Sequence, residues 1–199
     1  MDKVVEFRGT DGLVIAEVTE DTSTNYTTGD VEELAPVAEI GKEIAQGKAT
    51  KHYDNKPMIV IRSKGEDTIT CQVPVLSLKT LAMVTGQYYD EETGALLEGT
   101  PTEKYFALGY RLKLTDGTYR YVWRLKGAFS IPTETSKTED DGTESQGQQL
   151  QYTGITPIHK FAKGGNKSAV VVDERDGKVD VSDFFGQVVT PDSLAPLTA

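Results

Sequence analysis

The stretch from Tyr105 to Pro132 constrains the fold more than any other part of the chain. It reads YFALGYRLKLTDGTYRYVWRLKGAFSIP, two alternating runs separated by Asp116 and Gly117. An Asp-Gly pair between alternating apolar residues is a strong hairpin signal, because both positions of a two-residue turn need φ above zero. The pattern therefore predicts a β-hairpin within a mainly β protein.

Side chains alternate across a strand, so each arm of this hairpin has two faces. The apolar residues of both arms are expected to share one face, and the predicted hairpin core is Tyr110, Leu112, Tyr121, Trp123 and Leu125. The basic residues are expected on the other face, and they are Arg111, Lys113, Arg120, Arg124 and Lys126. Such a face could contact phosphates, or acidic segments of the same chain or of a neighbour. The acidic surplus elsewhere in the chain favours the second interpretation.

Composition favours one medium-sized core with exposed excursions, because only 37% of the 199 residues are hydrophobic. No apolar run approaches the roughly 20 residues that span a bilayer, so no membrane association is expected. The acidic start MDKVVEFRGTDG lacks an apolar run, and no signal peptide is expected either. The single cysteine, Cys71, excludes an internal disulfide and fits a reducing compartment.

The net charge of −10 is unevenly distributed. Residues 1–35 carry nine acids and two bases, and residues 132–146 carry five acids and one base, whereas residues 36–131 carry eleven acids and thirteen bases. Solubility alone would explain acidic flanks. The more specific interpretation is an acidic surface that does not retain a polyanion, since nucleic-acid binders have the opposite sign.

The spacing of turn residues predicts many short strands and therefore a β-sandwich or barrel. Two strands are expected in residues 4–18 around a Gly-Thr-Asp-Gly turn, followed by an acidic arm over residues 19–33. Residues 37–61 are expected to form three strands with turns, because Gly41 and Gly47 disfavour a helix.

One short helix is predicted over residues 77–85, with Ser77 as N-cap and Gly86 at the C-terminal cap. Thr93-Gly94 marks a small hairpin or loop, residues 133–147 an acidic loop, and the tail from Pro191 is expected to be loose. The predicted organisation is 1–33 as N-terminal strands and arm, 34–160 as the core with a projecting hairpin and the acidic loop, and 161–199 as a last strand and tail.

No catalytic or metal-binding constellation emerges, and neither an enzyme nor a cofactor is expected. The two histidines, His52 and His159, have no partners at ligand spacing, and Cys71 alternates with Ile69 and Val73 like a buried apolar residue. The carboxylate clusters around residues 90–92, 140–141 and 173–180 lack the calcium-loop pattern. Residues 164–168 lack the glycine and the strand-to-helix context of a phosphate-binding loop.

Three segments resemble the major tail tube proteins of long-tailed, non-contractile (siphovirus-type) bacteriophages. They are LAPVAEIGKEIAQGKATKHYDNKPMIVI (residues 34–61), YVWRLKGAFSIP (residues 121–132), and the acidic loop that leads into QLQYTGI. The resemblance covers roughly residues 30–160. It implies a β-sandwich or barrel with a flanking helix and extended arms, assembled as hexameric rings that stack into the tail tube.

The resemblance also implies a place in the virion, with synthesis in the host bacterial cytoplasm. The partners would be further copies of the chain, the tail terminator, tape measure and baseplate or initiator proteins, with DNA passing through the lumen during ejection. An acidic lumen would repel DNA phosphates and keep the DNA sliding. Glu39 and Glu43 share a strand face in the predicted pattern and are the proposed lumen-lining residues.

Contacts between subunits or rings are expected on the excursion over residues 48–56 and on the arms at residues 19–33 and 133–147. The contact residues proposed are Lys48, Lys51, His52, Tyr53, Asp54, Glu139, Asp140 and Asp141. Two other functions remain open at this point. One is a ring or tube protein of a related secretion system, and the other is a monomeric β-sandwich that binds calcium or a carbohydrate.

Overall fold

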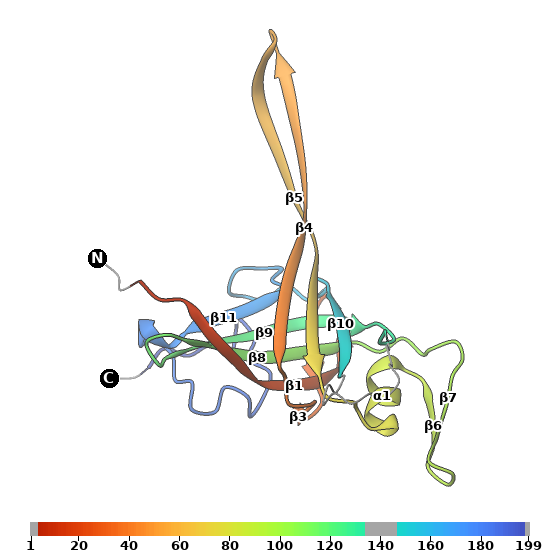
Figure 1. Ribbon diagram of the computed structural model, residues 1–199. Helices are drawn as coiled ribbons and strands as arrows, with labels where there is room; N and C mark the ends of the chain where they lie inside the picture. Colours follow the sequence, from red (N-terminus) through yellow and green to blue (C-terminus); the bar gives the residue numbers. More distant parts are fainter. Residues whose placement is uncertain (1–3, 134–146, 198–199) are drawn as a thin grey trace, which may run out of the picture.

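The protein is described by a computed structural model that covers residues 4–133 and 147–197, with the backbone alone for residues 48–49, 52–53, 57 and 61–64 (Figure 1). Its elements, in chain order, are β1 (Phe7–Asp21), β2 (Tyr26–Thr28), β3 (Glu32–Glu33), β4 (Glu39–Tyr53), β5 (Lys56–Val73), α1 (Leu78–Thr85), β6 (Tyr88–Asp90), β7 (Ala95–Leu97), β8 (Phe106–Leu114), β9 (Tyr119–Phe129), β10 (Gln148–Gly154), β11 (Ala169–Asp173) and the 3-10 helix η1 (Glu174–Asp176). The predicted fold class, mainly β and sandwich-like with one short helix, is confirmed for these residues.

Nine of these strands form one antiparallel sheet, whose main path runs β2-β1-β8-β9-β10-β5-β4. Strand β9 is central because one edge pairs with β8 and the other edge is shared by two strands. Residues 120–124 pair with β11, and residues 127–129 pair with β10. The sheet therefore divides along β9, and β10, β5 and β4 form a layer apart from β11 (Figure 1).

Two hydrophobic cores lie on the two faces of the β1-β8-β9 part of the sheet. The first lies between this part and the β10-β5-β4 layer, and α1 adds Val84 to it. Its largest fully buried members are Tyr152, Phe106, Leu13, Ile15, Ile69, Leu108 and Leu150. The second is covered by the C-terminal segment (residues 155–197), which includes β11. This segment contributes Phe161, Phe184 and Val188 around the fully buried Trp123.

The prediction of one apolar and one basic hairpin face is wrong. Tyr110 pairs with Val122, and Gly109 pairs with Trp123, so the apolar residues of the two arms lie on opposite faces. The reason is the loop: Leu114 N–H donates to Thr118 O (2.9 Å), and of the Asp-Gly pair only Gly117 takes a positive φ (93°). A three-residue loop with glycine in the left-handed region shifts the pairing by one residue, which exchanges the faces of one arm.

The helix and the small hairpin after it are confirmed. The Ser77 side chain accepts a hydrogen bond from Thr80 N–H at the start of α1, and Gly86 (φ 70°) ends the helix in the left-handed conformation. Strands β6 and β7 form a two-stranded hairpin whose turn contains Gly94 (φ 70°).

Three sequence predictions differ from the structure. The expected turn near residue 12 is a bulge inside the single strand β1, with Gly12 at φ 65°. The three strands expected in residues 37–61 are β4 and the first part of β5, since Gly41 and Gly47 lie within β4. The tail expected to be loose is tied back, because Pro191 is buried and Leu197 N–H donates to Lys178 O (2.8 Å).

The β8–β9 register can be tested by Gly109→Ala. A Cβ atom at Gly109 would lie 2.7 Å from Val14 Cγ2 and 3.0 Å from the Trp123 ring, so we expect a loss of about 1–3 kcal/mol in unfolding free energy. Gly9→Ala is the matched control, because a Cβ atom there has no neighbour within 4 Å and the effect on the unfolded chain is the same. Equal stability of the two variants in urea denaturation would contradict the register.

Candidate assembly surfaces

The long β4–β5 hairpin extends well beyond the sheet (Figure 1). The two strands pair as far as Tyr53 and Lys56, but only residues 67–73 of β5 also pair with β10. At the tip, Asp54 (φ 49°) and Asn55 (φ 60°) are both left-handed, as a two-residue hairpin turn requires. The turn of this hairpin is thus at residues 54–55, and Pro57 lies within the outer part of β5.

The projecting part of this hairpin exposes apolar side chains. Met58, Ile59 and Val60 are 67%, 46% and 50% exposed. Among the residues of 45–66 whose side chains the structure describes, none belongs to either hydrophobic core. Residues 45–66 also carry five bases and two acids. A two-stranded ribbon is marginally stable by itself. The projecting part of the hairpin thus combines exposed apolar side chains with a surplus of basic residues.

The predicted contact residues fall into two groups. Lys48, Lys51, His52, Tyr53 and Asp54 all lie at the outer end of this hairpin, where Lys51 and Asp54 are exposed. The structure describes only the backbone at Lys48, His52 and Tyr53. Glu139, Asp140 and Asp141 lie outside the described residues.

The outer face of the β4-β5-β10 layer is polar. Glu39 and Glu43 are both exposed and lie on this face, opposite Gln72 and Thr68 of β5. On the next strand, Gln149 and Thr153 of β10 pair with Gln72 and Thr68, so each glutamate begins a row of three side chains across the layer. Between them lies a middle row, which is Gly41, Thr70 and Gln151. The face thus combines two carboxylates with amides and hydroxyls, and none of these row residues is basic.

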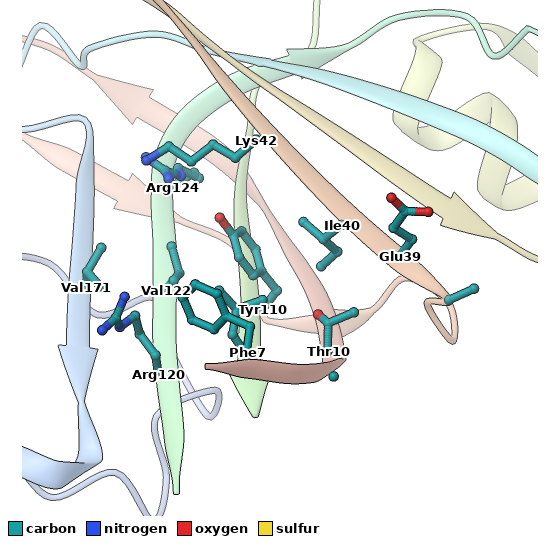
Figure 2. A pocket seen from close by; sticks show the side chains of 13 residues that line it. Phe7, Thr10, Glu39, Ile40, Lys42, Tyr110, Arg120, Val122, Arg124 and Val171 are labelled. Atoms are coloured by element: carbon teal, nitrogen blue, oxygen red, sulfur yellow. The ribbon is translucent and has the colours of Figure 1, made fainter. Parts of the chain in front are cut away.

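A cavity of ≈ 550 Å³ lies where the first residues of β4 leave part of the other layer uncovered. Its lining residues are Phe7, Gly9, Thr10, Ala38, Glu39, Ile40, Lys42, Tyr110, Leu112, Arg120, Val122, Arg124 and Val171. Ile40 from β4 and Tyr110 from β8 point toward each other across it (Figure 2). We call it the β4–β11 groove. It is mostly apolar, with three basic side chains and one acidic side chain in its walls.

Four of the five basic residues of the central hairpin form ion pairs within the chain. Arg124 Nη1 donates to Asp67 Oδ2 (2.8 Å), and both side chains are almost fully buried. Further ion pairs are Arg111–Asp11, Arg120–Asp173 and Lys126–Asp21. Asp173 also accepts hydrogen bonds from Arg175, and these, with those from Arg120, lower the pKa of its carboxyl. The structure therefore shows these basic residues in contact with acidic residues of the same chain. Such contact belongs to the second of the two interpretations that the sequence offered for them.

Asp21, at the end of β1, ties three parts of the chain together. Its carboxylate accepts hydrogen bonds from Lys126 Nζ (2.7 Å) and from the backbone N–H groups of Ile158 and His159 (2.9 Å each). Burial acts to raise the pKa of Asp21, but these three donors outweigh it and the pKa is lowered. Nearby, Tyr26 O–H donates to Leu125 O. This contact holds Tyr26, which lies in the segment 19–33 that the sequence predicted as an acidic arm, against β9.

Cys71 and His159, which could in principle act as a nucleophile or a ligand, contribute to packing instead. Burial raises the pKa of Cys71 to about 12, so its thiol is not a nucleophile at neutral pH. His159 packs edge-on against Phe161, with 4.9 Å between ring centroids. Within residues 4–133 and 147–197, no group of three His, Cys, Asp or Glu residues could hold a metal ion. In the same part of the chain, no helix has the length and apolar character needed to cross a membrane.

Comparison with known proteins identifies no relative: no protein-family model matches the chain, and no curated protein matches it.

Sequence reasoning missed the β4–β11 groove. Its lining comes from five strands or their flanks, between Phe7 and Val171, and no local pattern unites them. One available signal was the surplus of apolar residues in the central hairpin, which is larger than a single buried face needs.

We expect Asp21→Asn to lower the unfolding free energy by about 2 kcal/mol at pH 7, because a charged acceptor for three donors is lost. A lowered pKa in the folded protein means that the contribution of Asp21 is present above the ordinary aspartate value of 3.8 and is lost as pH falls through the folded pKa. The difference from wild type should therefore narrow below about pH 4. The exposed Asp30→Asn is the control, and an equal loss at pH 7 and pH 3 for Asp21→Asn would contradict the assignment.

Proposed function

We propose that this chain is a structural subunit of a siphovirus-type bacteriophage tail tube, which forms hexameric rings that stack around a channel for DNA. The observation that carries the proposal is the projecting part of the β4–β5 hairpin, together with the resemblance of residues 34–61 and 121–132 to major tail tube proteins. In this role the chain acts in the virion, after synthesis in the host cytoplasm, with no catalytic step.

The hairpin supports an assembly role because the fold of the single chain does not need it. Neither core includes any residue of 45–66 whose side chain the structure describes. Burying the remaining exposed surface of Met58, Ile59 and Val60 against another subunit would contribute on the order of 1 kcal/mol each. An exposed ribbon of this kind is a pairing hazard for a monomer and an asset for a repeating assembly. We assign it to contacts between successive rings.

The polar outer face of the β4-β5-β10 layer suits the wall of a channel for DNA. Glu39 and Glu43 would repel phosphates, and the amides and hydroxyls around them offer weak, neutral contacts. Four basic side chains of the central hairpin (Arg111, Arg120, Arg124 and Lys126) form ion pairs with carboxylates of the same chain. We propose this face as the lumen wall, and the tail terminator, tape measure and baseplate or initiator proteins as the partners at the tube ends.

Within residues 4–133 and 147–197, no specific feature favours a calcium- or carbohydrate-binding module. Of the carboxylates in the Asp90–Glu92 cluster, Asp90 accepts hydrogen bonds from Glu92 N–H and Thr93 O–H in its own turn, and Glu91 pairs with Lys79. A tube or ring protein of a secretion system would use the same surfaces, and only the genetic context separates it from a tail tube.

The test is light scattering coupled to size-exclusion chromatography over a concentration series, with negative-stain images of the same fractions. Wild type should form rings or hollow tubes. A variant in which Asn-Gly replaces residues 47–63 joins the Gln46–Lys64 pair by a two-residue turn and keeps the buried Asp67. This variant should remain folded, with wild-type melting behaviour, but should fail to form tubes. A wild-type chain that stays monomeric and gains thermal stability from calcium or a glycan would contradict the proposal.

A further inference from the structure

The segment between α1 and β8, residues 86–104, forms a short arm beside α1 (Figure 1). Two hydrogen bonds close its base: Thr102 N–H donates to Gly86 O (2.8 Å), and the Gln87 side chain accepts from Gly99 N–H (2.9 Å). Beyond this base, β6 and β7 pair with each other. We call this segment the β6–β7 arm. It is an ordered extension held by its own hydrogen bonds.

The arm exposes a pair of large apolar side chains. Tyr88 and Leu97 lie directly opposite each other in the pairing of β6 with β7, and they are 65% and 55% exposed. Exposed large apolar side chains that lie side by side form a patch that a partner can bury.

The charge of the arm is strongly acidic. Residues 86–104 carry five acids and one base, which gives −4. Ion pairs with the rest of the chain leave this balance unchanged, because Glu91 pairs with Lys79 while Lys104 pairs with Glu17. The apolar pair of the arm is therefore surrounded by an excess of carboxylates.

The projecting part of the β4–β5 hairpin has the opposite charge. Residues 45–66 carry five bases and two acids, which gives +3. Lys51 and Lys56 are exposed, as are the apolar side chains of residues 58–60. Lys51 lies opposite Ile59 in the pairing of β4 with β5, so basic and apolar side chains are neighbours on the hairpin. Opposite charges around two apolar patches are the complementarity by which interfaces select their partners.

The two surfaces lie at opposite ends of strand β5 (Figure 1). Lys56, at its start, adjoins the turn of the projecting hairpin, and Val73, at its end, leads into α1 and the arm. The 18 residues of β5 span on the order of 50 Å at about 3.3 Å per residue. The hairpin therefore cannot reach the arm of its own chain, and a contact between them needs two copies.

Two features together select the arm among the acidic parts of the chain: its exposed apolar pair and its place at the end of β5. The acidic segment 19–33 is fully described and exposes no large apolar side chain. The acidic residues within 173–183 lie beside the β8–β9 turn, where Glu174 accepts from Tyr119 N–H. The β4–β11 groove has three basic side chains and one acidic side chain in its walls, so it offers the hairpin no acidic surplus.

We propose that the projecting part of the β4–β5 hairpin of one copy docks on the β6–β7 arm of a second copy, with Met58, Ile59 and Val60 against Tyr88 and Leu97. The proposal rests on the proposed function, which assigns this hairpin to contacts between successive rings, and it names the surface that receives the hairpin. Because the two surfaces differ and lie at opposite ends of β5, the contact is head-to-tail. A head-to-tail contact that does not close on itself continues as a filament, as the stacking of rings requires.

Cysteine cross-linking in the full chain tests the contact directly. Thr50→Cys is combined with Leu97→Cys, because Thr50 is exposed opposite Val60 and its replacement keeps all three apolar side chains of the hairpin. The native Cys71 is buried and its pKa is raised to about 12, so it stays silent toward a short bis-maleimide. The double variant should give a ladder of covalent oligomers on a denaturing gel, with loss of most of the monomer band. Either single variant should give at most a dimer.

The matched control combines Thr50→Cys with Ile158→Cys, because Ile158 is as exposed as Leu97 (59% and 55%) but lies outside the arm. A ladder of equal strength from this control would overturn the proposal. Tubes that form without the cross-link between positions 50 and 97 would also overturn it and would leave the proposed function intact. A ladder without rings or tubes would support the head-to-tail contact and count against the tube. Neither association nor cross-linking at any concentration would contradict both.

A charge variant tests why the arm is selected. Glu92→Lys with Glu98→Lys, both at exposed positions, brings the arm from −4 to zero, and it should raise the protein concentration needed for tubes at least about tenfold. Glu6→Lys with Asp176→Lys makes the same change in net charge at exposed positions outside both surfaces and should leave that concentration unchanged. Equal effects of the two variants would contradict selection of the arm by charge.

Discussion

The rest of the structure depends on the register of the β8–β9 hairpin. The three-residue loop with Gly117 at φ 93° places Tyr110 and Trp123 on opposite faces of the sheet. Each face then carries large apolar side chains, and each needs a covering layer. The β10-β5-β4 layer covers one face and the C-terminal segment covers the other. Trp123 shows the need for the C-terminal cover, because its ring is fully buried in that core and its Nε1 donates to Phe184 O (3.0 Å).

The two layers that cover the β1-β8-β9 part of the sheet leave some of its residues uncovered. The β10-β5-β4 layer stops short of β11, which creates the β4–β11 groove. Strands β4 and β5 continue past the sheet as a ribbon, and the β6–β7 hairpin extends from the molecule beside α1 (Figure 1). The proposed stacking contact on the projecting part of the β4–β5 hairpin is thus separate from both layers that cover the β1-β8-β9 part of the sheet.

Local signals in the sequence predicted the local elements well. Ser77 and Gly86 predicted both ends of α1, and Thr93-Gly94 predicted the β6–β7 turn, because caps and turns depend on neighbours in the chain. The register of β8–β9 was not predictable in the same way. Asp-Gly occurs in both two- and three-residue loops, and the choice depends on which faces receive a distant cover.

The candidate surfaces also divide into features that local sequence predicts and features that depend on distant parts of the chain. Glu39 and Glu43 were expected to share a strand face, and alternation alone is enough for that. The outward reach of residues 48–56 could be inferred from their sparse apolar content, but the length of the ribbon could not. The pairing of Asp21 with Lys126, Ile158 and His159 joins segments more than a hundred residues apart, beyond the reach of any local pattern.

The central claim is that the projecting part of the β4–β5 hairpin is stabilised by another copy of the chain. Hydrogen exchange measured on the monomer and on the assembled fraction tests it most directly. In the monomer the amides of residues 47–63 should exchange far faster than those of β9, and assembly should slow them by at least about tenfold while β9 changes little. Amides in residues 47–63 that are as protected as β9 in the monomer, or that remain fast after assembly, would contradict the claim.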